Sequence, residues 1–279
     1  MGNIDALSKQ FMSHPDVFAE FHELLFRLRG MGLTISTDGL TEKDSDVTVA
    51  LTGQHMRSME RCNDIVRQVN VMKDGESKPV IFCLEIQSYV RYDQAVQNCT
   101  CLAIRLEQQV QRLHNCHQLE KKHKSGKMEK LPMQRMVKGD SLPVIVQTVL
   151  YLGMEPWDAA GSLSELWDGH FREMNQLMLD CPVNLVCPAT LSDELIDGLH
   201  TDFRALAIFS RYGSDVNALK GYLDNEPMLK HISYDAARLI AALFHVDLNL
   251  KLKKETVDMY TAIRDMIEMG KQEERKIAE

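Results

Sequence analysis

The sequence predicts an α/β fold followed by an all-helical C-terminal region. Two strand-length runs flank an Asp-Gly turn, a long polar helical segment follows them, and from Ser192 onward the pattern is helical throughout. The chain has 279 residues, of which 44% are apolar and 26% charged, so it is long enough to bury a core. We expect a division into residues 1–190 and a helical region, 191–279.

At the N-terminus, residues 5–29 are expected to form one amphipathic helix, because their apolar residues recur close to the 3.6-residue period. Gly30 then ends it. Residues 33–60 have a mixed pattern, with a candidate strand at 47–51.

The next two strands are predicted at 64–71 and 79–87, on either side of a turn at Asp74 and Gly75. Asp-Gly between two apolar runs is a strong hairpin signal. A long helix is then expected over about 91–119.

A polar, basic loop is expected at 120–140, and it is followed by strands at 142–150 and 183–186. The 142–150 run is almost continuously apolar, which is typical of a strand covered on both faces. Ser192 and Ser233 have N-cap character before helical stretches. The last helix is expected over 253–279.

Charge is distributed unevenly along the chain. The formal net charge is −8, but residues 1–140 hold 19 Lys and Arg against 18 Asp and Glu, while residues 141–279 hold 13 against 22. Any nucleic-acid site should therefore lie in the first half. We find no apolar run of bilayer length and no secretory signal, and we expect a cytoplasmic protein with no membrane partner.

The seven cysteines are odd in number and lack the paired spacing of a zinc module or a disulfide framework. We expect free thiols and no zinc site.

The Asp-Gly turn fixes a register for the hairpin if the loop has two residues. Lys73 then faces Glu76, and continuing the same pairing places Asp64 opposite Glu85. Gln87 projects from the same strand face as Glu85, because side chains alternate along a strand. The opposite face is almost entirely apolar, with a single exception, Arg67.

Two opposed carboxylates repel each other unless something lies between them. A hard divalent cation takes such oxygen ligands, lowers the pKa of a bound water and stabilises displacement at phosphorus. The alternative interpretation is structural: Asp64 caps the start of a strand, while Glu85 and Gln87 lie exposed at a strand end.

Asp64 followed by Glu85-Ile86-Gln87-Ser88 resembles the D…(D/E)xK/Q signature of the PD-(D/E)xK nuclease superfamily. More closely, the chain resembles the Rpn family of recombination-promoting nucleases, which are also described as transposases. Supporting segments are Tyr92 and Asn98, Pro143 to Ile145, Val149 to Gly153, Trp157-Asp158, Asn184 to Ala189 and Val257 to Met259.

The resemblance implies a restriction-endonuclease-like mixed sheet flanked by helices, with an αβββαβ core, and metal-dependent hydrolysis of DNA. It makes Asp64 and Glu85 the metal ligands and, with Gln87, the catalytic residues, and it implies Mg²⁺, or else Mn²⁺ or Ca²⁺. The chain departs from the pattern at Asn63, where arginine is frequent, and at Gln87, where the superfamily has lysine. Since an amide cannot carry a positive charge, we expect Gln87 to position the attacking water.

Three functions compete. The first is a metal-dependent DNA endonuclease associated with recombination or mobile elements. The second is a catalytically inactive module of the same fold that binds nucleic acid or serves in assembly. The third is a helical oligomerisation protein, which would form a homodimer through its C-terminal helices.

Overall fold

A computed structural model describes residues 2–43, 63–125, 135–169, 174, 176–213, 215–244 and 256–259. The chain forms two compact units: residues 38–185 make one, and residues 1–37 together with 186–279 make the other. The N-terminal helices are thus grouped with the C-terminal helices, whereas the expected division was a single break after residue 190.

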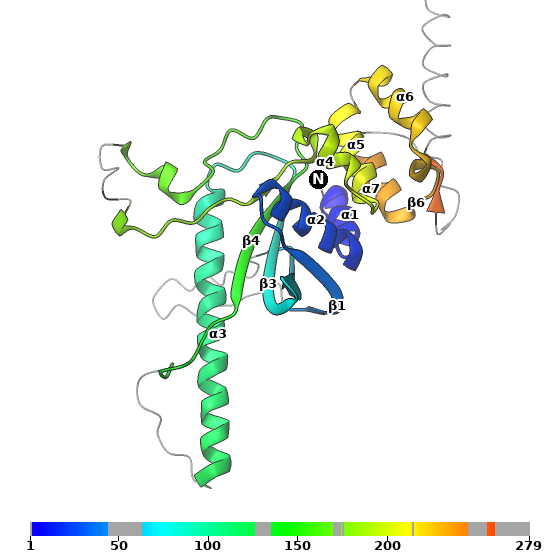
Figure 1. Ribbon diagram of the computed structural model, residues 1–279. Helices are drawn as coiled ribbons and strands as arrows, with labels where there is room; N and C mark the ends of the chain where they lie inside the picture. Colours follow the sequence, from blue (N-terminus) through cyan, green and yellow to red (C-terminus); the bar gives the residue numbers. More distant parts are fainter. Residues whose placement is uncertain are drawn as a thin grey trace, which may run out of the picture. The chain divides into compact units, whose positions relative to one another are not determined.

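Most of a mixed five-stranded sheet with the order β1-β2-β3-β4-β5 lies in the first unit (Figure 1); the start of β1 and the last residue of β5 fall outside its bounds. Strands β2 and β3 are antiparallel, whereas β3 and β4 are parallel. The expected mixed α/β class is therefore confirmed. The strands are β1 (Thr34–Glu42), β2 (Ile65–Lys73), β3 (Glu76–Gln87), β4 (Val144–Tyr151) and β5 (Leu185–Val186).

The β2–β3 hairpin has the predicted register. Lys73 pairs with Glu76 and Ile65 pairs with Leu84, nine pairs in all without a slip. Asp74 and Gly75 both have positive φ, 50° and 83°, as the two central residues of a type I′ turn require. The turn sequence therefore sets which residues lie opposite each other along the whole hairpin.

One face of the hairpin is buried and apolar, as expected, and Arg67 is the exception on that face. Its side chain is only 3% exposed, and Nη2 donates to Oε1 of Glu42 on β1 at 2.8 Å. Strand β1 was not predicted. Most of its described side chains are polar and none is buried, so it lacks the apolar alternation that marks a half-buried strand.

Helix α3 (Gln94–Ser125) runs along β4 and contacts it (Figure 1). Ala95 on α3 packs in one apolar cluster with Val149 on β4 and with Leu163, Cys181 and Val183. The helix was predicted, but the expected loop at 120–140 is wrong at its start, since residues 120–125 are helical. Their sequence is rich in Lys and Glu, which favour helix. Residues 126–134 lie outside the described residues.

Two helices replace the single N-terminal helix expected over 5–29: α1 (Gly2–Met12) and α2 (Pro15–Leu28). Pro15 stands at the first turn of α2, where its missing N–H costs nothing, and the residue before it, His14, is extended. The proline therefore divides the apolar pattern. The candidate strand at 47–51 lies outside the described residues.

The second unit contains these two helices and the C-terminal elements; α1 packs against α7 and α2 against α5. Both predicted N-caps are confirmed, because the hydroxyls of Ser192 and Ser233 accept from backbone N–H groups. The helices are α4 (Asp193–Asp197), α5 (Phe203–Tyr212), α6 (Val216–Asn225) and α7 (Tyr234–Phe244).

The all-helical expectation for this region is wrong at one place. Strands β6 (Ile232–Ser233) and β7 (Thr256–Val257) form a small antiparallel sheet. The expected helix at 253–279 therefore cannot include Thr256 and Val257, whose β-branched side chains favour strand; residues 260–279 lie outside the described residues. Among the helices that the structure describes, none is long and apolar enough to cross a membrane.

Candidate functional site

The candidate site lies where β2 begins and β3 ends. Asp64 directly precedes β2, and its backbone N–H donates to the carbonyl of Leu84 at 2.9 Å. Its carboxylate Oδ2 accepts from the backbone N–H of Ile86 at 2.8 Å. If the β2–β3 ladder continued in the same register, the N–H of Ile86 would instead donate to the carbonyl of residue 63. The Asp64 side chain therefore terminates the β2–β3 ladder.

Glu85 and Gln87 lie on the same face of β3 and bind each other. Oε1 of Glu85 accepts from Nε2 of Gln87 at 3.0 Å. Glu85 is half-buried and Gln87 is only 4% exposed, so neither lies exposed at a strand end. The alternative interpretation is thus right about the capping role of Asp64 and wrong about the exposure of the other two residues.

Helix α3 adds a third residue, Gln97, whose Nε2 reaches Oε1 of Glu85 at 3.4 Å. Nearby on the same helix, Gln94 donates to Asn98 at 2.8 Å, and both side chains are buried. Sequence reasoning did not single out Gln97. A signal was present, because residues 94, 97 and 98 place three amides on one helix face.

Several buried amide atoms on α3 make no hydrogen bond within the part of the chain that the structure describes. They include Oε1 of Gln94, Oε1 of Gln97 and Nδ2 of Asn98. A buried polar atom without a partner costs free energy and commonly indicates a water or an ion. The interface between α3 and the sheet therefore has buried polar atoms that a water or an ion could satisfy.

Asn63, where the resemblance leads us to expect arginine, has a structural partner. Its Nδ2 donates to Oε1 of Gln147 on β4 at 2.8 Å, and both side chains are buried. The bond ties the segment just before Asp64 to β4. Asn63 therefore helps to fix the start of β2, although an amide cannot supply the positive charge of an arginine.

The donor set of the site consists of oxygen atoms. Asp64 and Glu85 supply carboxylates, and the partnerless Oε1 of Gln97 is an amide oxygen beside them. Mg²⁺ is commonly held by one or two carboxylates together with waters and substrate phosphate, so these residues fit Mg²⁺, Mn²⁺ or Ca²⁺. Within the described ranges, no group of three or more His, Cys, Asp or Glu is placed to hold a metal ion.

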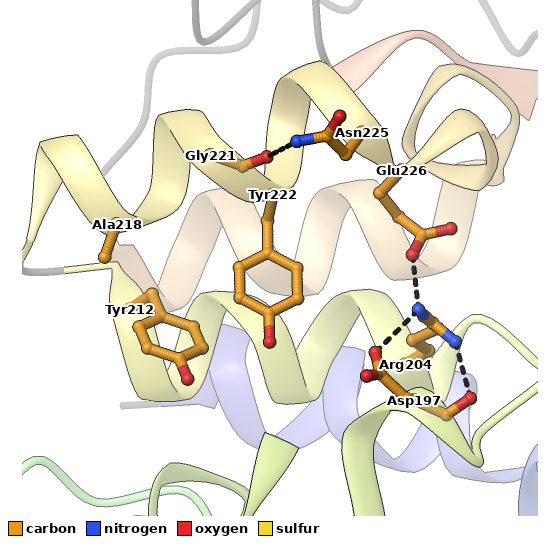
Figure 2. Close-up of a pocket in the computed structure, with 8 residues that line it drawn as sticks. All are labelled: Asp197, Arg204, Tyr212, Ala218, Gly221, Tyr222, Asn225 and Glu226. Atoms are coloured by element: carbon orange, nitrogen blue, oxygen red, sulfur yellow. Dashed lines mark hydrogen bonds and ion pairs between the residues drawn. The ribbon is translucent and has the colours of Figure 1, made fainter. Parts of the chain in front are cut away.

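The second unit has a pocket of its own, with a volume of about 530 Å³ (Figure 2). The rings of Tyr212 and Tyr222 stack there with centroids 5.0 Å apart, and burial raises the pKa of Tyr222 to about 12. Arg204 forms ion pairs with Glu226 and Asp197. Its charge is therefore already matched, and no residue proposed from the sequence lines this pocket.

No family model, no curated protein and no solved structure matches this chain.

Proposed function

We propose that the protein is a metal-dependent DNA endonuclease with a restriction-endonuclease-like fold, similar to the Rpn recombination-promoting nucleases. One observation carries the proposal. The hairpin register brings Asp64 and Glu85 to the same end of the sheet, where Gln87 and Gln97 both donate to the Glu85 carboxylate. Asp64, Glu85 and Gln87 would be the catalytic residues, with DNA as substrate.

The order of elements along the chain supports this proposal. A helix (α2), three strands (β1, β2 and β3), a long helix (α3) and a further strand (β4) follow one another. This is the αβββαβ order that the resemblance implies. The candidate residues stand at the start of the second strand and at the end of the third, at the opposite end of the hairpin from the turn that joins these strands.

Within the site, Asp64 and Glu85 would hold the metal through their carboxylates. The hydrogen bonds to Oδ2 of Asp64 and Oε1 of Glu85 are compatible with a bound metal, because each carboxylate has two oxygens and about four lone-pair sites. A bound Mg²⁺ supplies a water of lowered pKa and neutralises charge on the phosphate.

Gln87 would act through Glu85 in this arrangement. Its amide donates to Oε1, which fixes the orientation of the carboxylate without adding a charge. A lysine there would add a positive charge. Because Gln87 cannot supply this charge, the metal would be the group that stabilises the negative charge on the phosphate. The positioning of water by Gln87 stays a prediction.

The test is cleavage of supercoiled plasmid by the full-length protein with Mg²⁺ or Mn²⁺, and in the presence of a chelator. We expect metal-dependent nicking by the wild type and its loss in Asp64→Asn and Glu85→Gln, which keep the shapes of the side chains. Glu76→Gln is the matched control, because Glu76 is an exposed carboxylate at the other end of the same hairpin.

Nicking that persists in both site variants would contradict the proposal, since the activity would then come from elsewhere or from a contaminant. Gel-shift binding of DNA without any nicking would favour the second candidate, an inactive nucleic-acid-binding module. The capping of Ile86 by Asp64 favours that candidate, because it gives this carboxylate a structural role that needs no metal. The homodimer through the C-terminal helices stays a prediction.

A further inference from the structure

The unit that contains the candidate site also has a pocket, which begins directly after the last residue of β3. It has a volume of about 420 Å³ and is formed by Ser88, Tyr89, Val90 and Tyr92, in the segment directly after β3, and by Tyr151 with the segment that follows β4. Gln87 is the last residue of β3, and Tyr89 is two residues further on. Two residues of chain span at most roughly 7 Å, so the pocket begins about one nucleotide away from the candidate site.

Two tyrosines of this pocket present their rings to solvent. Tyr89 is 57% exposed and Tyr92 is 64% exposed. Large aromatic side chains that remain exposed beside a candidate active site are available to stack on a ligand. The hydroxyl of Tyr92 donates to Oδ2 of Asp158 at 3.3 Å, which joins the two sides of the pocket.

The floor of the pocket is formed by Tyr151, a lining residue whose side chain is buried. Its hydroxyl donates to the carbonyl of Glu155 at 2.7 Å, and its ring meets Trp157 edge to face at 5.1 Å. Gly153 lies against the same ring, since a Cβ there would come within 2.3 Å of the hydroxyl. The buried side of the pocket is therefore held by a hydrogen bond and by aromatic packing, while the two exposed tyrosines form part of its wall.

The charges of the pocket exclude a phosphate as its occupant. Glu155 and Asp158 line it, and no Lys or Arg is among the described residues that do so. A carboxylate repels phosphate but accepts hydrogen bonds from N–H groups. A flat, uncharged ring that carries N–H donors meets both conditions, and nucleobases with exocyclic amino groups are such rings.

We propose that this pocket binds one unpaired nucleobase of a DNA strand held at the candidate site, with a preference for bases that bear an exocyclic amino group. The proposal rests on the proposed nuclease function and narrows it to single-stranded or locally opened DNA. Tyr89 and Tyr92 stack on the base, as aromatic platforms do in single-strand binding. Asp158 accepts from the amino group, and unstacking a base costs least where it is already unpaired.

Arg91 lies in the chain between Tyr89 and Tyr92, although its own side chain is not among the described side chains that line the pocket. It pairs with Asp93 at 2.8 Å, and its pKa is raised by that hydrogen bond and by the nearby Glu85 and Tyr89. A cation in this position can contact the backbone phosphate of the nucleotide whose base lies in the pocket, next to the phosphodiester held at the candidate site.

The test is the affinity of the full-length Asp64→Asn protein for fluorescently labelled oligo-dC and oligo-dU, measured by anisotropy with a chelator present. These two probes have the same backbone and ring size, and they differ at positions 3 and 4 of the ring, where cytosine has an acceptor nitrogen and an exocyclic amino group and uracil has an N–H and a carbonyl. We expect tighter binding of oligo-dC, and a loss of this preference in Asp158→Asn. Tyr89→Ala and Tyr92→Ala should each weaken binding of both probes by about tenfold.

Trp167→Ala is the control, because Trp167 is an exposed aromatic residue elsewhere in the same unit. Unchanged affinity in both tyrosine variants, or equal affinity of the parent protein for the two probes, would overturn the proposal. The assay contains no metal and detects no cleavage. Failure of the nuclease proposal would appear separately, as absent plasmid nicking by a protein that still binds oligo-dC through its tyrosines.

Discussion

The carboxylate of Asp64 accepts a hydrogen bond from the backbone N–H of Ile86, 22 residues further along the chain, at 2.8 Å. The bond stands where the β2–β3 ladder would otherwise continue, so the Asp64 side chain ends the hairpin at the same end of the sheet as Glu85. The same residue therefore has a structural role that the structure shows and a catalytic role that we propose.

These two roles of Asp64 are separable by substitution. Asp64→Ala leaves the N–H of Ile86 without its acceptor, which should lower the free energy of unfolding by about 1–3 kcal/mol. Asp64→Asn retains an acceptor oxygen and should cost less, while both variants lose nicking. Urea denaturation followed by tryptophan fluorescence measures the difference, because Trp157, one of the two tryptophans, packs against the core of this unit. Equal stability of the two variants would show that the hydrogen bond contributes nothing.

Gln97 should support metal binding through Glu85. Gln97→Ala removes a donor to Oε1 of Glu85 and an adjacent amide oxygen. Loss of a partner that orients a ligand typically lowers metal affinity by about 10- to 100-fold. Titration calorimetry with Mn²⁺ measures this change.

Gln111→Ala is the matched control for this variant, because Gln111 is an exposed glutamine on the same helix that donates to Asn115, one helical turn away. A Gln97→Ala protein that binds Mn²⁺ as tightly as the Gln111→Ala protein would remove Gln97 from the site.

The buried carboxylate of Glu20 should be important for the stability of the second unit. It accepts from the backbone N–H of His200, from the backbone N–H of Thr201 at 3.0 Å and from the Thr201 hydroxyl. Glu20→Ala leaves these donors unsatisfied and should lower the free energy of unfolding by about 3 kcal/mol. Loss of helical circular dichroism in urea reports on this helix-rich unit. Asp16→Asn, an exposed carboxylate on the same helix, should change it by about 1 kcal/mol or less.

Cys181 should be an unreactive thiol. Burial raises its pKa from the ordinary value of 9.0 to about 11, and the thiolate is the reactive form. At pH 8, iodoacetamide should label the exposed Cys116 of the native protein and leave Cys181 unmodified until the chain is denatured. Mass spectrometry of the labelled peptides distinguishes the two residues.

The same shift gives a pH dependence with a definite sign. Because the pKa of Cys181 is higher in the folded state, the unfolded chain loses this proton first as the pH rises. The contribution to stability is therefore complete below pH 9 and is lost between pH 9 and about 11. Cys181→Ala should show a smaller alkaline loss of stability than the wild type, and an equal loss in both would contradict this assignment.

Local chemistry in the sequence determined the hairpin and the pairing within it. Asp74 and Gly75 adopt the positive φ angles of a two-residue turn, and such a turn leaves one register for the strands on either side. The α/β class, the long helix and the N-caps at Ser192 and Ser233 were predicted for similar reasons. Each depends on residues that are close in sequence.

The sequence could not show where the helices pack or how the carboxylates are held. Pro15 divides an apolar pattern that by itself predicts one helix. Strand β1 has no apolar alternation because its described side chains are not buried. Gln97 contacts Glu85 because α3 packs on the sheet, and the sequence does not show how these two elements pack.

The sequence by itself therefore determined which residues face each other across the Asp74-Gly75 turn, from Lys73 and Glu76 to Ile65 and Leu84, whereas the expected pairing of Asp64 with Glu85 stays a prediction. Only the tertiary structure decided that Asp64 caps Ile86, that two amides hold Glu85, and that a tyrosine-walled pocket adjoins Gln87. The physical reason is range: a turn acts through backbone angles within a few residues, whereas these contacts join segments that approach only when the core is packed.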